Sequence, residues 1–176
     1  MSENIKKIER KYLPEIVYGS MDGAITTFAV VSGVSGASLN SSIILILGFA
    51  NMFADGFSMA ISNFFSTKSK NEISKKYEKN ATKSAIVTFI AFFISGLIPL
   101  LSFLIASITK DPFFVRNQFK LSFVFTSIAL LIVGWFKGVV TEKHKYKSSI
   151  QTFLIGSIAA LLAFCIGYLL NKFIRV

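Results

Sequence analysis

Cysteine, histidine and acidic residues are scarce in this sequence of 176 residues. It contains one cysteine, Cys165, one histidine, His144, and nine acidic residues against 19 lysines and arginines. A single cysteine excludes an internal disulfide. His144 stands in a basic tract, where a solvated side chain is a simpler interpretation than a metal ligand. The chain also lacks a nucleophile–base pair and a phosphate-binding loop, so we predict that it is not an enzyme.

Charge is segregated as well as scarce. Hydrophobic residues make up 53% of the chain and its mean hydropathy is +0.62, which excludes a disordered protein and is unusual for a soluble one. Of the nine acidic residues, only Asp22 and Asp55 lie inside apolar runs. The isoelectric point near 9.8 could suggest a nucleic-acid partner. However, the basic residues form short tracts between apolar runs, and no soluble domain remains to bind a duplex, so we predict no such partner.

Five apolar runs approach or exceed the roughly 20 residues that a helix needs to span about 30 Å of hydrocarbon. They lie at about 16–38, 42–66, 84–108, 120–140 and 149–171. Residues 1–15 are polar and basic, and the first run is too long for the core of a signal peptide. We therefore predict an all-α integral membrane protein, with a cytosolic tail at 1–15 and one five-helix membrane domain at 16–176.

Lysine and arginine are distributed unevenly among the segments between these runs. Of the 19, 14 lie in the N-terminal tail, in the link 67–83 and near the link 141–148, which alternate with segments carrying the other five. Cytosolic segments of membrane proteins are enriched in these residues. The asymmetry predicts a cytosolic N-terminus and, after five crossings, a C-terminus on the opposite side.

The second run, GFANMFADGFSMAISNFF at residues 48–65, carries polar side chains along one face. At 100° per residue that face holds Asn51, Asp55, Ser58, Met59, Ser62 and Ser66. Phe53 and Phe57 fall on the opposite side. A charged side chain at the centre of a membrane helix costs at least about 2.5 kcal/mol. A stripe that includes Asp55 therefore indicates a helix that lines a site or a pathway.

The first and fifth runs carry related stripes. On the first run one face holds Tyr18, Asp22, Thr26, Ala29, Gly33 and Gly36. Small residues of this kind allow another helix to approach closely. On the fifth run Gly156 and Gly167 belong to a stripe of small residues without charge, which we interpret as helix packing only.

The estimated depths in the bilayer place the polar residues of the first and second runs at similar levels. With a rise of about 1.5 Å per residue, Asp22 lies roughly 10 Å, Met59 roughly 12 Å and Asp55 roughly 18 Å from the cytosolic side. Two aspartates can neutralise a divalent cation, and a thioether favours late first-row metals over Mg²⁺ or Ca²⁺. Carboxylates in apolar surroundings can also hold protons. This set of residues therefore permits the exchange of a metal for protons.

Several segments resemble the vacuolar iron transporter family. YGSMDGAITTFAVVSGVSGA and ANMFADGFSMAISNFFSTKSK resemble its first and second helices, and GWFKGVVTE and GSIAALLAFCIGY are similar to its fourth and fifth. The resemblance implies a five-helix homodimer in the lipid bilayer, with the pathway near the two-fold axis. It further implies transport of Fe²⁺ and often Mn²⁺ out of the cytosol in exchange for protons. The metal is then a transported substrate, and no permanently bound cofactor is expected.

The resemblance assigns roles to particular residues. Asp22 corresponds to the transport aspartate of the family, Met59 to a methionine of its second helix and Lys68 to the lysine that closes that helix at the mouth of the pathway. Asn51 stands where plant members have a glutamate, and Asp55 follows one turn later where they have a small residue. We interpret this as a carboxylate that has moved along the helix. Thr26 and Ser62 share the polar faces of Asp22 and Asp55 and are expected to line the same route.

One part of the family pattern is missing. Well-studied plant members carry a long glutamate-rich cytosolic domain between their second and third helices. Here the link is the basic segment 67–83, whose only acidic residues are Glu72 and Glu78, too few for a multi-metal site. Metal capture is therefore expected to rely on the membrane site alone.

Simpler explanations exist for single residues and for the whole chain. Met59 alone fits core packing, and Asn51 alone fits a hydrogen bond between helices. A passive cation channel and a non-transporting membrane scaffold are the alternatives to a secondary transporter. Tight neutralising carboxylates slow the exit of an ion and weigh against a channel. A scaffold predicts that Asp22→Asn leaves function intact.

Overall fold

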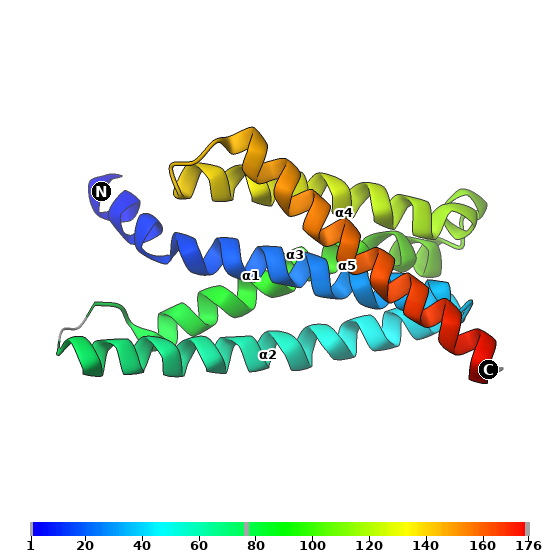
Figure 1. Cartoon of the computed structure of the whole chain (residues 1–176), viewed down its shortest axis with the longest axis horizontal. Coiled ribbons are helices and arrows are strands. Elements are labelled where there is room, and N and C mark those ends of the chain that lie inside the picture. Colours follow the sequence, from blue (N-terminus) through cyan, green and yellow to red (C-terminus); the bar gives the residue numbers. More distant parts are fainter. Residues whose placement is uncertain (1, 76–77, 175–176) are drawn as a thin grey trace.

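Five α-helices make up nearly all of the chain that the computed structural model describes, residues 2–75 and 78–174, with side chains described from residue 11 onward. They are α1 (Ser2–Gly36), α2 (Ser41–Ser74), α3 (Ala81–Thr109), α4 (Pro112–Val140) and α5 (Lys145–Ile174). No strand occurs among these described residues. The prediction of an all-α protein is confirmed, and Figure 1 shows the helices as a bundle elongated along one axis.

Each helix is longer than the apolar run that predicted it. α1 passes through Pro14 without interruption, so the tail predicted at 1–15 is helical from residue 2. α2 continues to Ser74, which corrects the prediction that a loop occupies all of 67–83. Lysine and glutamate are good helix formers, so the end of the apolar run does not end the helix. α2 stops where Lys75 adopts a left-handed conformation with φ 52°.

α1 differs from the other four helices. Among the described helices, α2, α3, α4 and α5 are long and apolar enough to cross a membrane, whereas α1 is the least apolar of the five. α1 packs against each of the other helices. Its residues Ala24, Thr27 and Val31 are fully buried. A helix covered by its neighbours presents little surface to lipid and can carry small and polar residues. Four candidate spans are thus established, and the fifth crossing stays a prediction.

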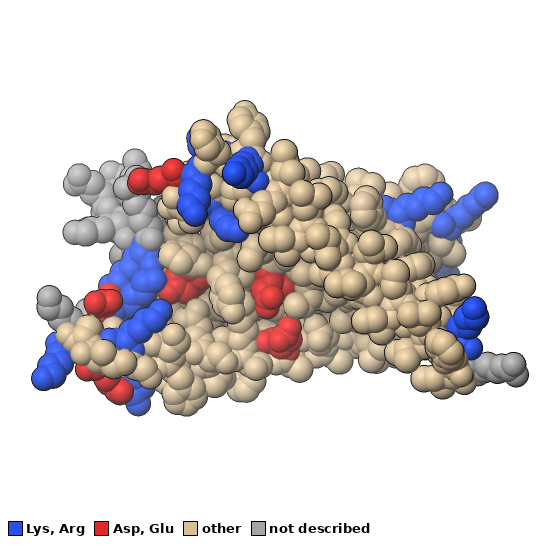
Figure 2. Space-filling view, viewed as in Figure 1, with Lys and Arg blue, Asp and Glu red and all other residues tan. Residues whose placement is uncertain are grey.

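The links between helices fall into two groups at opposite ends of the bundle. Figure 1 shows the N-terminus, the α2–α3 link and the α4–α5 link at one end, with the other two links and the end of α5 at the other. The first group contains the basic tracts of the sequence. Figure 2 shows lysine and arginine gathered at both ends, with a mostly uncharged band between them in which acidic side chains appear.

Glycines bring α1 close to α3. A Cβ atom on Gly19 would lie 2.6 Å from the backbone oxygen of Thr88, and one on Gly23 would collide with the backbone oxygen of Phe92. Close approach of two backbones is a recurrent way of packing membrane helices, because dispersion contacts replace the hydrophobic drive that lipid removes. Gly23 directly follows Asp22, so this contact also fixes the position of that carboxylate along the bundle.

We predict that Gly23→Ala destabilises the bundle and that Gly33→Ala does not. The new methyl at residue 23 collides with a backbone atom that has no room to shift, and overpacking of this kind costs about 1–3 kcal/mol. At Gly33 the nearest atom would lie 3.5 Å away, an ordinary contact. Thermal unfolding of the two purified variants in the same detergent checks this. Equal midpoints would contradict the packing described for α1 and α3.

Candidate functional site

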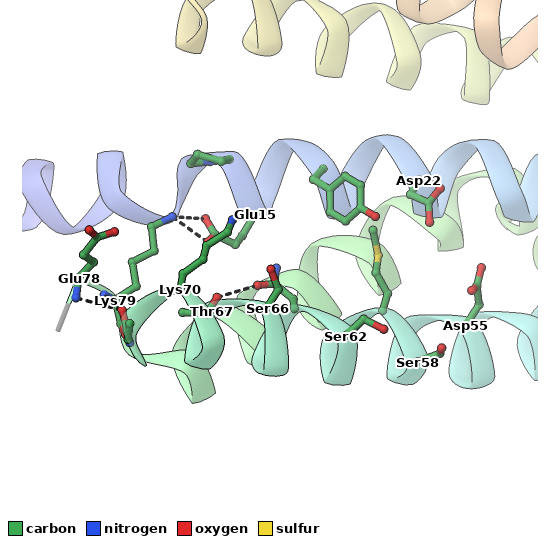
Figure 3. A pocket seen from close by; sticks show the side chains of 15 residues that line it. Glu15, Asp22, Asp55, Ser58, Ser62, Ser66, Thr67, Lys70, Glu78 and Lys79 are labelled. Atoms are coloured by element: carbon green, nitrogen blue, oxygen red, sulfur yellow. Dashed lines mark hydrogen bonds and ion pairs between the residues drawn. The ribbon is translucent and has the colours of Figure 1, made fainter. Parts of the chain in front are cut away.

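A cleft of about 690 Å³ lies between α1 and α2 and extends to the α2–α3 link. Four carboxylates line it: Glu15 and Asp22 from α1, Asp55 from α2 and Glu78 from the link. Two lysines, Lys70 and Lys79, line the same cleft. Figure 3 shows that the lysines and Glu78 lie toward one end of the cleft, whereas Asp22 and Asp55 lie toward the other.

Asp22 and Asp55 point toward each other across the cleft (Figure 3). Both side chains are partly buried, and they come from different helices, Asp22 from α1 and Asp55 from α2. Two carboxylates that face each other in a medium of low dielectric repel when both are ionised. A divalent cation between them, or protons on them, removes that repulsion.

Met59 and a row of serines complete the α2 wall of the cleft. Met59 is 8% exposed and lines the cleft one turn along α2 from Asp55. Ser58, Ser62 and Ser66 follow at intervals of four residues, line the cleft and are exposed. A thioether next to two carboxylates is a mixed ligand set, which suits late first-row metals better than Mg²⁺ or Ca²⁺.

Three of the residues predicted for the pathway lie outside the lining of the cleft. The Thr26 hydroxyl donates a 2.8 Å hydrogen bond to the backbone oxygen of Asp22, one turn earlier in α1. Asn51 is half-buried, and within the described part of the chain its Nδ2 atom has no hydrogen-bond partner. Lys68 is exposed, and the lysines that line the cleft are Lys70 and Lys79.

The predicted packing glycines lie on the other half of α1 and on α5. A Cβ atom on Gly36 would collide with the backbone of α5, and one on Gly167 would collide with the backbone oxygen of Gly33. A Cβ atom on Gly156 would meet Leu130 of α4 at 2.5 Å. The stripe of α1 that was read as one face therefore serves two purposes, since its first half lines the cleft and its second half packs against α5.

Sequence reasoning missed two residues at the mouth of the cleft. Glu15, assigned to the tail, is 7% exposed, and its Oε1 atom lies 2.8 Å from Nζ of Lys79. The available signal was spacing: Glu15 precedes Asp22 by seven residues, about two helical turns, and so shares its face. The link lysine gave no signal, because its position depends on how the chain folds back from α2 to α3.

Asn63 was also missed, because it lies on α2 just outside the predicted stripe. Its Nδ2 donates a 2.6 Å hydrogen bond to the Thr88 hydroxyl of α3, and its Oδ1 accepts a 3.1 Å hydrogen bond from Thr67. These bonds connect the cleft wall to α3. Buried amides commonly join membrane helices in this way.

The donors in one copy of the chain do not complete a metal coordination shell. Among the described residues, no group of three or more His, Cys, Asp or Glu side chains is placed to hold a metal ion. Asp22, Asp55 and Met59 supply two carboxylates and a thioether, whereas first-row divalent ions take about four to six donors. Water, the serine hydroxyls or another copy of the chain would have to supply the remainder.

Comparison with known proteins identifies the family. The model of the VIT family matches residues 13–80 and 72–168. The chain belongs to this family. Relatives include the vacuolar iron transporter of Plasmodium berghei, 25% identical over 93% of this chain and 84% of that protein. Vacuolar iron transporter 1 of Eucalyptus grandis is 26% identical over 85% of this chain and 83% of that protein. The VIT-family protein described here is a multi-pass integral membrane protein.

The comparisons also show a difference in length between this VIT-family chain and some of its relatives. The two matched segments overlap at residues 72–80, where α2 ends and the α2–α3 link lies. The Plasmodium alignment spans 229 positions, more than the 176 residues of this chain, so that transporter has segments that this chain lacks. The alignment with Arabidopsis vacuolar iron transporter homolog 3, 28% identical over 85% of this chain and 78% of that protein, spans only 162 positions.

We predict that the serine row of α2 is accessible to water. In a Cys165→Ala background, Ser62→Cys is expected to react with a small polar thiol reagent, because the cleft that it lines is open. Phe57→Cys is the control, since Phe57 is also exposed but lies outside the lining of the cleft. Mass spectrometry of the labelled protein in lipid nanodiscs measures both. Equal labelling would show that exposure, and not the cleft, governs access.

Proposed function

We propose that this protein is a secondary transporter that moves a divalent transition metal, Fe²⁺ or Mn²⁺, out of the cytosol in exchange for protons. The observation that carries the proposal is the pair Asp22 and Asp55, which face each other across a cleft in the uncharged band of the molecule, with Met59 beside them. Membership of the VIT family, with relatives named as iron transporters, supports the same substrate class.

The two carboxylates explain why metal and protons would exchange at one place. A divalent ion between Asp22 and Asp55 cancels their charges, which lowers the cost of holding three ions away from water. When the ion leaves, protons are the remaining species that can cancel the repulsion. A site that must always hold one or the other couples the two fluxes.

We further propose that the transporter is a homodimer whose pathway lies near the two-fold axis. One copy supplies too few donors for a first-row metal, and its serine row, Ser58, Ser62 and Ser66, is exposed on the open side of the cleft. A second copy across a two-fold axis would present the same residues again. The coordination shell would then be shared between the two protomers.

The proposed direction of transport rests on topology. Five crossings, with the N-terminus and the α2–α3 and α4–α5 links in the cytosol, agree with the location of 14 of the 19 lysines and arginines in these segments or beside them. The separation of the two groups of links in Figure 1 supports the same arrangement. The cleft then opens toward the cytosol through its lysine-lined end.

We predict that Glu72→Cys and Asn171→Cys label from opposite sides of the membrane. Each substitution is made in the Cys165→Ala background. Glu72 lies near the end of α2 and Asn171 near the end of α5, at opposite ends of the bundle. A membrane-impermeant reagent added outside sealed vesicles of one orientation should modify only one of them. Labelling of both from the same side would leave an even number of crossings between the two positions, which would contradict the crossing of α3, α4 or α5.

The transport proposal is tested by metal uptake into proteoliposomes with an imposed pH gradient. We predict that wild-type protein takes up Fe²⁺ or Mn²⁺ in proportion to the gradient and that Asp55→Asn abolishes uptake while the protein still folds. Removal of a charge from a membrane helix lowers its insertion cost. Flux that ignores the gradient would favour a channel. No flux in the wild type would favour a scaffold.

A rescue tests whether the carboxylate has moved along α2. Asn51 lies one turn before Asp55, and its unpartnered Nδ2 means that no hydrogen bond of that atom is lost on replacement. Uptake that is absent in Asp55→Ala is expected to return in Asn51→Glu with Asp55→Ala. Glu142→Gln, in the exposed α4–α5 link, is the matched loss of a carboxylate away from the cleft. Normal uptake by Asp55→Ala alone would make Asp55 a structural residue.

A further inference from the structure

Glu15 is a buried carboxylate at the mouth of the cleft that the proposed exchange at Asp22 and Asp55 does not use. It accepts hydrogen bonds from Nζ of Lys79 at 2.8 and 3.1 Å and from the hydroxyl of Ser84 at 3.2 Å. Figure 3 shows Glu15 on α1 and the lysine side chain reaching it from the start of the cleft. Its place on the face of Asp22, about two turns away, puts it on the same route.

A purely structural explanation of this ion pair is weak. Burial of two charges seldom stabilises a protein more than apolar side chains of the same size would, because desolvation cancels most of the attraction. The pair also lies in an open cleft and not in the apolar core of Phe28, Val31, Met52 and Leu100. The position of Glu15 therefore calls for a role that needs its charge.

The lysine side chain can leave Glu15 without disturbing the link that carries it. The backbone oxygen of Lys79 accepts a 2.8 Å hydrogen bond from Nδ2 of Asn71, and the backbone N–H of Glu78 donates a 3.1 Å bond to Oδ1 of the same residue. The N–H of Asn80 donates a 3.3 Å bond to the Tyr12 hydroxyl. The backbone is thus held by α1 and α2 independently of the ion pair.

The ammonium that is paired with Glu15 also lies close to an aromatic ring and to water. Nζ of Lys79 is 5.8 Å from the centre of the Tyr12 ring, within the range of a cation–π contact, and the lysine side chain is 28% exposed. Release from Glu15 therefore leaves the ammonium near water and an aromatic face.

We propose that Glu15 is the outer binding residue for the transported divalent cation, and that the Lys79 ammonium is a tethered cation that occupies it until the metal displaces it. This inference rests on the proposed transport function. The exchange balances charge, since a divalent ion arrives at the carboxylate as the ammonium leaves. The serine row of α2 offers a polar wall along which the ion passes to Asp22 and Asp55.

The tethered ammonium would select ions by charge. It is held beside Glu15 by the chain itself, so its effective concentration there is high, of the order of millimolar or more. A monovalent ion has no Coulombic advantage over it, whereas a divalent ion has twice the attraction at equal distance. Selection at this point would replace part of the metal capture that relatives with a longer α2–α3 segment could perform there.

The test compares removal of each partner, because the proposal predicts opposite effects. In Mn²⁺ uptake by proteoliposomes, Glu15→Gln is expected to raise KM roughly tenfold with little change in kcat, in line with the loss of a supporting carboxylate. Lys79→Gln is expected to lower KM severalfold and to allow Na⁺ to inhibit. Lys79→Arg, a stronger bidentate partner for the carboxylate, is expected to raise KM. Effects of Glu15→Gln and Lys79→Gln in the same direction would overturn the proposal.

Controls separate this role from general electrostatics and from folding. Lys143→Gln and Glu142→Gln remove the same charges from the exposed α4–α5 link at the same end of the bundle, outside the lining of the cleft, and their KM is expected to change less than twofold. The double variant Glu15→Gln with Lys79→Met leaves no unpaired buried charge. It is expected to keep the raised KM of Glu15→Gln, whereas a wild-type KM in this variant would show a structural ion pair.

Direct binding distinguishes failure of this inference from failure of the transport proposal. Electron paramagnetic resonance can measure Mn²⁺ bound to purified protein in which Asp22→Asn and Asp55→Asn remove the inner carboxylates. The remaining weak binding is expected to tighten severalfold with Lys79→Gln and to disappear with Glu15→Gln, whether or not the protein transports. Mn²⁺ affinity that is the same with and without the two substitutions would overturn the role of Glu15. Mn²⁺ affinity that changes as expected, together with no proton-driven uptake by the wild type, would overturn the transport proposal alone.

Discussion

The cost of a carboxylate away from water is the constraint on which the rest of this structure depends. Asp22 and Asp55 lie in the uncharged band of the bundle and face each other, so two negative charges there repel each other unless an opposing charge lies nearby. Neither is given a lysine partner among the described residues, whereas Glu15 at the mouth is. The charge of the inner pair can therefore be neutralised by a metal ion or by protons that bind and leave. Alternate binding of this kind is the physical basis of the exchange site that we propose.

The packing of α1 follows from the same constraint. A helix that carries Asp22 would be poorly placed against lipid, and α1 is instead surrounded by the other four helices. Glycines at 19 and 23 allow α3 to approach on one side, while Gly36 allows α5 to approach on another. The side toward α2 is the one left open, and it contains the cleft. Small residues thus decide which face of α1 is available to an ion.

The sequence predicted most of the fold and about half of the site, for reasons that differ. Apolar runs locate membrane helices well because hydrocarbon demands long uncharged segments, but they underestimate α2, which continues through polar residues to Ser74. Periodicity placed Asp22, Asp55, Met59 and Ser62 on common faces, since a single helix fixes these relations. Periodicity could not predict that Thr26 and Asn51 lie outside the lining of the cleft, or that Lys79 pairs with Glu15. Such contacts depend on how separate helices pack.

The distribution of cations along the cleft connects entry with transport. At the mouth the opposing charge belongs to the chain, as Lys79 on Glu15, and it is permanent but movable. Further in, at Asp22 and Asp55, the exchange that we propose would supply the opposing charge as the metal ion or as protons. A divalent ion that replaces the ammonium at the first position would reach Asp22, two helical turns further along α1, and Asp55 opposite it on α2, which have no ion-pair partner in the described part of the chain. In the proposed mechanism each step inward would exchange one compensating charge for another, so that no carboxylate is left without an opposing charge in the low-dielectric interior. Glu15 already has a cation that the chain supplies, whereas Asp22 and Asp55 have none among the described residues. The inner carboxylates therefore gain more electrostatic stabilisation from a bound metal ion than the outer one does.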